Sequence, residues 1–330
     1  MGVRVTPDLD TIHSLPIKAD SGVEREPDIA FDGENYVVVW SEGFIAEYKV
    51  YASRVTTEGV VLDSGVPFGI DAFCEFGPGI DFDGNRYLAI WYTYNYSPYG
   101  VYGRFLTTEG KPEGDAILIR SFGSSYMFNP DIIFGGDKYL VVWNEPSIQG
   151  NEDIYGQLVS TSGGLIGGVI PIATDSAYQF NPRIAFRDSS YLVVWNQNSK
   201  IYGQWISTDG TLIGENFGIS DSTSENRSSP DVAIGMTNCL AVWMEYHGSS
   251  FDIYGNLDIL TGIKEECSRT IETYDYYSTT IISGQLSLPQ NEKCAVYDIM
   301  GRRIQPHDLA PGIYFIEVHG QVVQKIVKIR

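Results

Sequence analysis

Pairs of acidic residues recur along the chain at one fixed spacing, and carboxylates are the groups that acid–base catalysis and cation binding require. In each copy the first position follows a proline, and the second lies 14 residues later, two residues after a tryptophan. The five copies hold Asp28 with Glu42, Gly79 with Thr93, Asp131 with Glu145, Arg183 with Gln197, and Asp231 with Glu245. Where one member of a pair is acidic, so is the other.

If the two positions face each other across a β-hairpin, their like charges need an offsetting partner. One interpretation is a carboxylate-lined mouth that binds Ca²⁺ or sugar hydroxyls. The other is that each acid accepts a hydrogen bond from the backbone of a neighbouring repeat. The four cysteines form no C-x-x-C pair and the four histidines are scattered, so no zinc site is predicted and Ca²⁺ is the one cofactor considered.

These positions belong to a repeat of about 50 residues, which is typical of a propeller blade. Each copy contains a Pro-x-Ile-x-Phe segment, then a Tyr-Leu-Val-Val-Trp segment, then an Ile-Tyr-Gly segment, with small variations. The central tryptophans are Trp40, Trp91, Trp143, Trp195 and Trp243. An Asp-Gly turn such as Asp32-Gly33 joins the first two segments, which is a strong hairpin signal.

We therefore predict four strands per repeat and a five-bladed β-propeller over residues 1–262. The last repeat shows no clear fourth strand, and the segment Leu15-Pro16-Ile17 resembles one. We expect that N-terminal strand to complete the fifth blade and close the ring. Residues 3–6 resemble a further third strand, so we take the blade count as a lower bound.

Composition limits the partners. The formal charge is −20, which repels phosphate backbones, so nucleic acid is not expected as a partner. No apolar run is long enough to predict a transmembrane segment. The first residues do not read as a signal peptide, and we expect that the native signal peptide is missing from this sequence.

After the repeats we predict a linker over residues 263–282 and a small β-sandwich over residues 283–330. This last region resembles the C-terminal sorting domain of proteins exported by the bacterial type IX secretion system. The matching residues are Gly301 and Arg302 in a Val-Tyr-Asp-x-x-Gly-Arg motif, Gly312, Ile313, Tyr314 and Phe315 in the next strand, and Lys325 and Lys328 in a basic terminal strand. The resemblance implies the type IX secretion machinery as a partner and a secreted or cell-surface location.

The repeated acids decide the function predicted from sequence. A glycosidase needs two carboxyl groups in different environments, whereas these acids recur in near-equivalent settings. We therefore predict no enzyme, but a non-catalytic binding or scaffold module for a carbohydrate or protein ligand. A secreted carbohydrate-active enzyme of propeller type is the alternative, and an asymmetric acid pair facing the channel would favour it. A repeat region of a larger surface protein is the third hypothesis.

Overall fold

The computed structural model shows an all-β chain with two compact units, Met1–Lys264 and Glu265–Arg330. It describes residues 2–5, 11–18, 22–44, 47–94, 99–123, 128–147, 150–220, 226–235, 238–247, 250–257, 279–282, 294–298, 303–305, 312–318 and 321–328. Within these residues there is no helix with the length and apolar character needed to cross a membrane.

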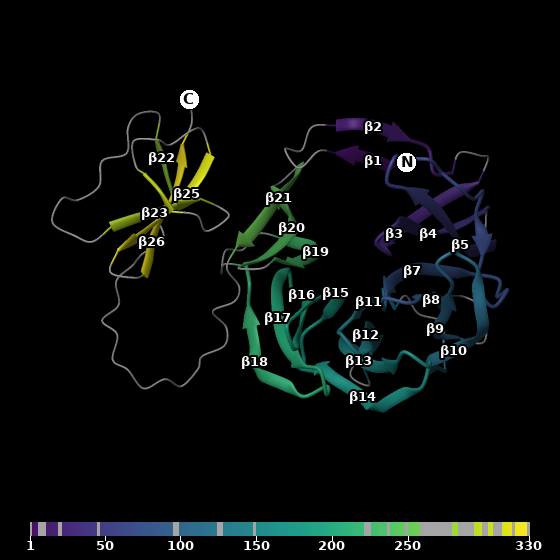
Figure 1. The fold of residues 1–330 in the computed structure, drawn as a ribbon. Helices are drawn as coiled ribbons and strands as arrows, with labels where there is room; N and C mark the ends of the chain where they lie inside the picture. Colours follow the sequence, from purple (N-terminus) through teal and green to yellow (C-terminus); the bar gives the residue numbers. More distant parts are fainter. Residues whose placement is uncertain are drawn as a thin grey trace. The chain divides into compact units, whose positions relative to one another are not determined.

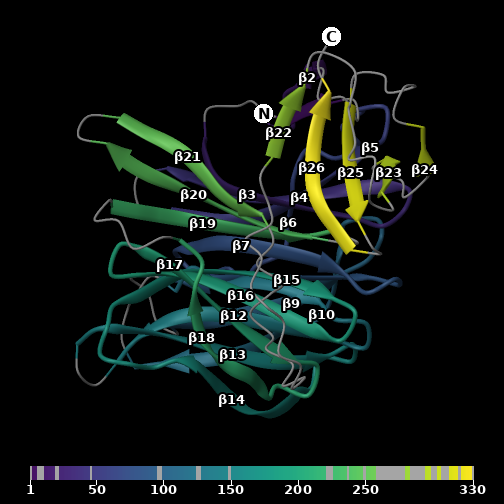
Figure 2. The same ribbon diagram turned by 90° about the vertical axis from the view of Figure 1, so that its left-hand side faces the viewer.

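The first unit is a five-bladed propeller, which confirms the predicted fold (Figure 1). Each blade is an antiparallel sheet, and its strands, which we call a to d in chain order, run from the inside of the ring outward. Blade one contains β3 (Val23–Phe31), β4 (Asn35–Phe44), β5 (Glu47–Thr56) and β6 (Val66–Pro67), and blade two contains β7 (Glu75–Phe82), β8 (Tyr87–Thr93), β9 (Tyr99–Leu106) and β10 (Pro112–Phe122). Blade three contains β11 (Asp131–Phe134), β12 (Lys138–Pro146), β13 (Glu152–Ser160) and β14 (Leu165–Ala173). Blade four contains β15 (Gln179–Arg187), β16 (Ser190–Gln197), β17 (Lys200–Ser207) and β18 (Leu212–Gly218). The fifth blade has β19 (Asn226–Ile234), β20 (Cys239–His247) and β21 (Ser250–Leu257). Figure 2 shows the blades edge-on, with the strands running along the axis of the ring.

Local sequence explains the hairpins of each blade. In the first a–b turn, Gly33 has φ +98°, which a side chain would oppose. The Asp32 carboxylate accepts a hydrogen bond from the Asn35 N–H at 2.6 Å, and the Asp32 N–H donates to the Asn35 carbonyl at 3.1 Å. The Asp-Gly pair therefore fixes the register of the two innermost strands.

The five repeated tryptophans occupy equivalent positions on strand b, as predicted. Each pairs across the ladder with the tyrosine of strand c, in the pairs Trp40–Tyr51, Trp91–Tyr102, Trp143–Tyr155, Trp195–Tyr202 and Trp243–Tyr254. Strand d of the preceding blade covers the tryptophan, as where Phe68 meets the Trp91 ring edge-on at 5.5 Å. The core consequently lies between blades, and each blade depends on its neighbours.

The N-terminal strands β1 (Gly2–Val5) and β2 (Thr11–Leu15) pair with each other in a separate two-stranded sheet. They lie at the outside of the ring between β21 and β4 (Figure 1). The segment 15–17, expected to complete the fifth blade, thus reaches this part of the ring, but among the described strands β21 pairs with β20 alone.

The described strands of the second unit form one five-stranded sheet in the order β22-β26-β25-β23-β24, rather than the two sheets of a sandwich, and β22 falls within the predicted linker. Its strands are β22 (Thr279–Ile282), β23 (Cys294–Asp298), β24 (Arg303–Ile304), β25 (Gly312–Val318) and β26 (Gln321–Lys328). Gly312 and Tyr314 of the sorting-type motif fall in β25, and Lys325 and Lys328 fall in β26. Gly301 and Arg302 lie outside the described residues.

Candidate active site in the central channel

The innermost strand of every blade contains the same backbone irregularity, immediately before its proline. The residue at this place has a positive φ in all five blades: Glu26, Gly77, Asn129, Asn181 and Ser229. A left-handed residue before proline is unusual, because the proline favours an extended predecessor. It inserts a β-bulge into strand a, and the a–b register shifts there in blades one, two, four and five.

This bulge separates the acids that share the 14-residue spacing. In the first blade Asp28 pairs across the ladder with Val39, whereas Glu42 pairs with Glu24. In the fifth blade Asp231 pairs with Val242, and Glu245 pairs with Arg227. The aspartates of the pairs therefore line the channel at the axis. Their partners Glu42, Glu145 and Glu245 are not among its lining residues.

Each of the three glutamates is engaged by the tryptophan two residues before it. The indole N–H groups of Trp40, Trp143 and Trp243 donate to Glu42, Glu145 and Glu245 at 3.0, 2.9 and 3.3 Å. A cation then offsets each charge, through Lys18 to Glu42 at 3.7 Å, Arg120 to Glu145 at 2.8 Å, and Arg227 to Glu245 at 2.7 Å. These contacts hold the blade core together, and Glu42 also lines a separate cavity of about 570 Å³ with Lys49 and Tyr51.

The aspartates at the axis connect successive blades. Asp28 accepts a hydrogen bond from the Ile80 N–H, and Asp131 from the Ile184 N–H, both at 2.9 Å and both from the next blade. In the second blade, where Gly79 holds the equivalent position, Asp81 accepts from the Phe134 N–H at 2.6 Å. The interpretation of repeat acids as acceptors for neighbouring backbone therefore describes Asp28 and Asp131.

Between these strands lies a cavity of about 520 Å³, a size suited to a small ligand. The charged side chains that line it are Glu26, Asp28, Asp81, Asp131, Arg183 and Asp231. The neighbouring Asn129 and Asn181 are joined by an amide hydrogen bond of 2.8 Å at the bulges of two blades. The walls thus combine apolar strand residues with a small set of polar groups.

The acids of the channel are not equivalent. Burial raises the pKa of Asp131 to about 7, the Arg183 guanidinium opposes that rise, and the nearby Asp28 carboxylate adds to it. Burial also raises the pKa of Asp28 and of Asp81. Asp131 therefore carries a proton in part of the molecules near neutral pH, a state that suits proton donation.

Sequence reasoning missed three members of this set, Glu26, Asp81 and Arg183. Asp81 stands two residues beyond the repeat position, where its strand reads Pro-Gly-Ile-Asp-Phe, and Arg183 replaces an aspartate in the fourth blade. Both are breaks in the repeat, and a search for departures from the pattern would have singled them out. Within the described residues, no group of three or more His, Cys, Asp or Glu side chains is arranged to hold a metal ion.

The comparisons with known proteins concern the fold. No protein-family model matches the sequence, and no curated protein matches it either. Similar solved structures include a thermostable family-43 glycoside hydrolase (13% identity, 72% of this chain and 89% of that chain, TM-score 0.45). Others are an endo-arabinase from Bacteroides thetaiotaomicron (12%, 70% and 93%, 0.47) and an α-L-arabinofuranosidase from Lactobacillus brevis (10%, 74% and 91%, 0.43).

The prediction that the chain is not an enzyme is corrected by these findings. The three solved structures named above, with which the chain shares its fold, are named as glycoside-cleaving enzymes. The physical ground of the prediction was that the acids share equivalent settings. The structure contradicts that ground, because Asp81 and Arg183 break the symmetry of the channel.

Proposed function

We propose that the chain is a carbohydrate-active enzyme of propeller type that cleaves glycosidic bonds in the central channel. One observation carries the proposal: the cavity of about 520 Å³ contains an asymmetric set of carboxyl groups beside Arg183, and burial raises the pKa of Asp131 among them to about 7. Glycoside hydrolysis needs one carboxyl group that donates a proton and a second that accepts one.

In this proposal Asp131 is the general acid. It donates its proton to the glycosidic oxygen as the bond from that oxygen to the anomeric carbon breaks, and so becomes a carboxylate. Asp28, which lines the same cavity and interacts electrostatically with Asp131, is the general base. As a carboxylate it takes a proton from the water whose oxygen attacks the anomeric carbon. Arg183 stabilises the negative charge that remains on Asp131 after donation.

The test is release of reducing sugar from a panel of polysaccharides and aryl glycosides by the purified chain. On substrates found in that screen, Asp131→Asn should lower kcat by about 100-fold or more, the usual contribution of a general acid. The loss should be much smaller on nitrophenyl glycosides, because their leaving group departs without a proton. Asp137→Asn is the matched control, since Asp137 lies in the exposed a–b turn of the same blade.

Two results would count against the proposal. One is the absence of cleavage across the panel. The other is equal activity of Asp131→Asn and Asp137→Asn, which would show that Asp131 accepts backbone hydrogen bonds but donates no proton to a substrate.

We further propose that the chain is exported through the type IX secretion machinery and reaches the outer surface or the medium. The resemblance of the C-terminal residues to sorting domains supports this proposal, and Lys325 and Lys328 are the basic residues of its last strand. In a host with that system, replacement of both lysines by glutamate should leave the protein in the periplasm. Undiminished export of that variant would contradict the sorting role.

A further inference from the structure

One side of blade one and one side of blade five are exposed to solvent, whereas the equivalent sides of the other blades are buried against a neighbouring blade. The first is the side of blade one that faces away from blade two. Ile29 of strand a is 55% exposed, whereas its equivalents Ile80, Ile132 and Ile184 are 3% to 6% exposed. Tyr36 of strand b is 36% exposed, and the equivalent Tyr87, Tyr139 and Tyr191 are 0% exposed. In the later blades these side chains pack against the preceding blade.

The second is the side of blade five that faces away from blade four. Leu240 of strand b is 41% exposed, whereas the equivalent Leu88, Leu140 and Leu192 are 0% exposed. Ile253 of strand c is 72% exposed, and its equivalents Val101, Ile154 and Ile201 are 0% exposed. In the earlier blades these side chains pack against the following blade. Within the part of the chain that the structure describes, blades five and one therefore lack the apolar contact that joins the other neighbouring blades.

The strands β1 and β2 fill only the outer half of this seam. Leu15 of β2 packs on Trp40 of blade one, just as Phe68 of strand d packs on Trp91 of the next blade. Leu15 thus places β2 in the d position of a blade that precedes blade one, and β1, its partner, in the c position. None of the described strands fills the a and b positions of that blade.

The hydrogen bonds of Asp231, the channel aspartate next to the seam, are consistent with the same gap. Asp28 and Asp131 each accept a hydrogen bond from the backbone of the following blade. Asp231 in blade five accepts one from its own neighbour, the Val232 N–H, at 2.8 Å. Among the described residues, no N–H of another blade reaches it.

We propose that the seam between blades five and one is a receptor for a β-hairpin from outside residues 1–330 that has the pattern of the repeat's own a and b strands. Such a hairpin completes the half-blade begun by β1 and β2 and continues the apolar contact that Leu15 and Trp40 already make. Its first strand reads Pro-x-Ile-x-Phe, and its second reads Tyr-Leu-Val-Val-Trp. Its isoleucine and tyrosine cover Leu240 and Ile253, its leucine covers Ile29 and Tyr36, and its first strand supplies an N–H to Asp231.

The test uses the full chain and a fluorescent peptide with the a–b hairpin of blade three, residues 129–146. Binding is followed by anisotropy, with a scrambled peptide of the same composition as the control. The expected result is saturable binding of the hairpin alone and a melting temperature that rises with its concentration. Ile253→Arg and Ile29→Arg should each weaken binding by about tenfold or more, because a charge then faces an apolar partner.

Leu118→Arg is the matched control variant, because Leu118 is 46% exposed on β10 of blade two, away from the seam. All three substitutions replace exposed side chains, so the variants should fold, which their melting curves verify. Absence of hairpin binding would overturn the proposal, as would equal weakening by Leu118→Arg. A dimer in light scattering that Ile253→Arg converts to a monomer would also overturn it, because a second copy would then be the occupant.

Discussion

Asp131 and Glu145 belong to the same repeat pair, yet the structure places them in opposite circumstances. Glu145 is held by the Trp143 indole and by Arg120, so its charge is compensated inside the blade. Asp131 faces the channel beside Asp28 and Arg183, and burial raises its pKa to about 7. Asp231 likewise lines the channel, whereas Glu245 is held by the Trp243 indole and by Arg227. Identical spacing along the chain thus yields one set of acids that stabilises blades and another that is available to a ligand.

The largest effect is expected at Glu245, the most buried of the three glutamates that share the 14-residue spacing. Arg227 and Glu245 form an ion pair at 2.7 Å with both side chains nearly inaccessible to solvent. Glu245→Gln removes the carboxylate that faces this buried arginine and should lower the free energy of unfolding by about 3–5 kcal/mol. Urea unfolding followed by tryptophan fluorescence measures this change.

The double variant Arg227→Met, Glu245→Leu is the control for that experiment. It removes both charges and should recover most of the loss, since a buried pair is replaced by apolar groups. If Glu245→Gln unfolds at the same urea concentration as the parent, the contacts of this glutamate do not stabilise the blade, which would contradict the comparison with the channel aspartates.

Asp131 should affect stability in the opposite direction, because its ionisation in the folded chain is unfavourable. Its pKa is higher in the folded chain than in the unfolded chain, so the folded state binds more protons between about pH 4 and pH 7. Its contribution is fully present below the unfolded pKa and is lost as pH rises through about 7. Asp131→Asn keeps an oxygen that accepts the Ile184 N–H but cannot ionise. It should make the fall in the free energy of unfolding between about pH 4 and pH 7 smaller by about 2 kcal/mol. This figure is discounted because water in the channel screens the charge.

Thermal melts of parent and variant from pH 4 to pH 8 check this expectation. Asp137→Asn should leave the pH dependence as it is in the parent. A parent whose stability does not decline over this range would remove the evidence that Asp131 is costly to ionise.

The propeller could be predicted from sequence because tryptophan spacing, Asp-Gly turns and strand alternation all repeat with the blade. The site could be predicted only in part. Asp28, Asp131 and Asp231 do line the channel, but the separation of Glu42 from Asp28 and of Glu245 from Asp231 depends on a bulge at the positive-φ residue before the proline. A 14-residue spacing contains no sign of that bulge. Environment, rather than residue type, then decides which acid keeps its proton.

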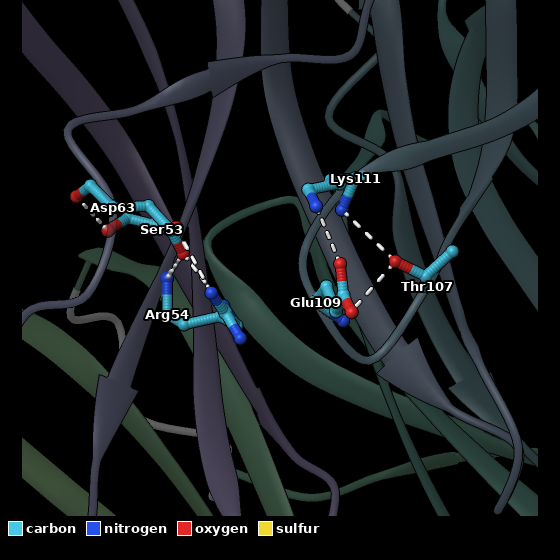
Figure 3. Close-up of polar contacts among 6 residues, drawn as sticks. All are labelled: Ser53, Arg54, Asp63, Thr107, Glu109 and Lys111. Atoms are coloured by element: carbon cyan, nitrogen blue, oxygen red, sulfur yellow. Dashed lines mark hydrogen bonds and ion pairs between the residues drawn. The ribbon is translucent and has the colours of Figure 1, made fainter.

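A smaller effect is expected for a partly exposed pair on the outer strands. The guanidinium of Arg54 on β5 donates two hydrogen bonds to the Asp63 carboxylate, at 2.9 and 3.2 Å, and the Arg54 backbone N–H donates a third at 3.2 Å (Figure 3). The bidentate geometry favours a contribution of about 1 kcal/mol, which Asp63→Asn should remove. The hydrogen bond from Arg54 lowers the pKa of Asp63, so this contribution is lost as pH falls, in contrast to that of Asp131. Urea unfolding at pH 7 and at pH 3 separates the two cases, and an Asp63→Asn difference that grows in acid would contradict the assignment.

The smallest effect should come from Glu109 and Lys111, the second contact drawn in Figure 3. Their charged atoms lie 2.6 Å apart, closer than those of Arg54 and Asp63, but both side chains are about two-thirds exposed, and the pair lies in a c–d turn. Water screens such charges, and ordering two long side chains costs entropy, so distance alone does not confer stability. Glu109→Gln should therefore leave the urea midpoint unchanged within error, at low and at high salt. A clear loss at low salt that disappears in 1 M NaCl would show that surface charge also stabilises the blades. The strongly acidic exterior would then have to be counted with the buried glutamates and the channel aspartates.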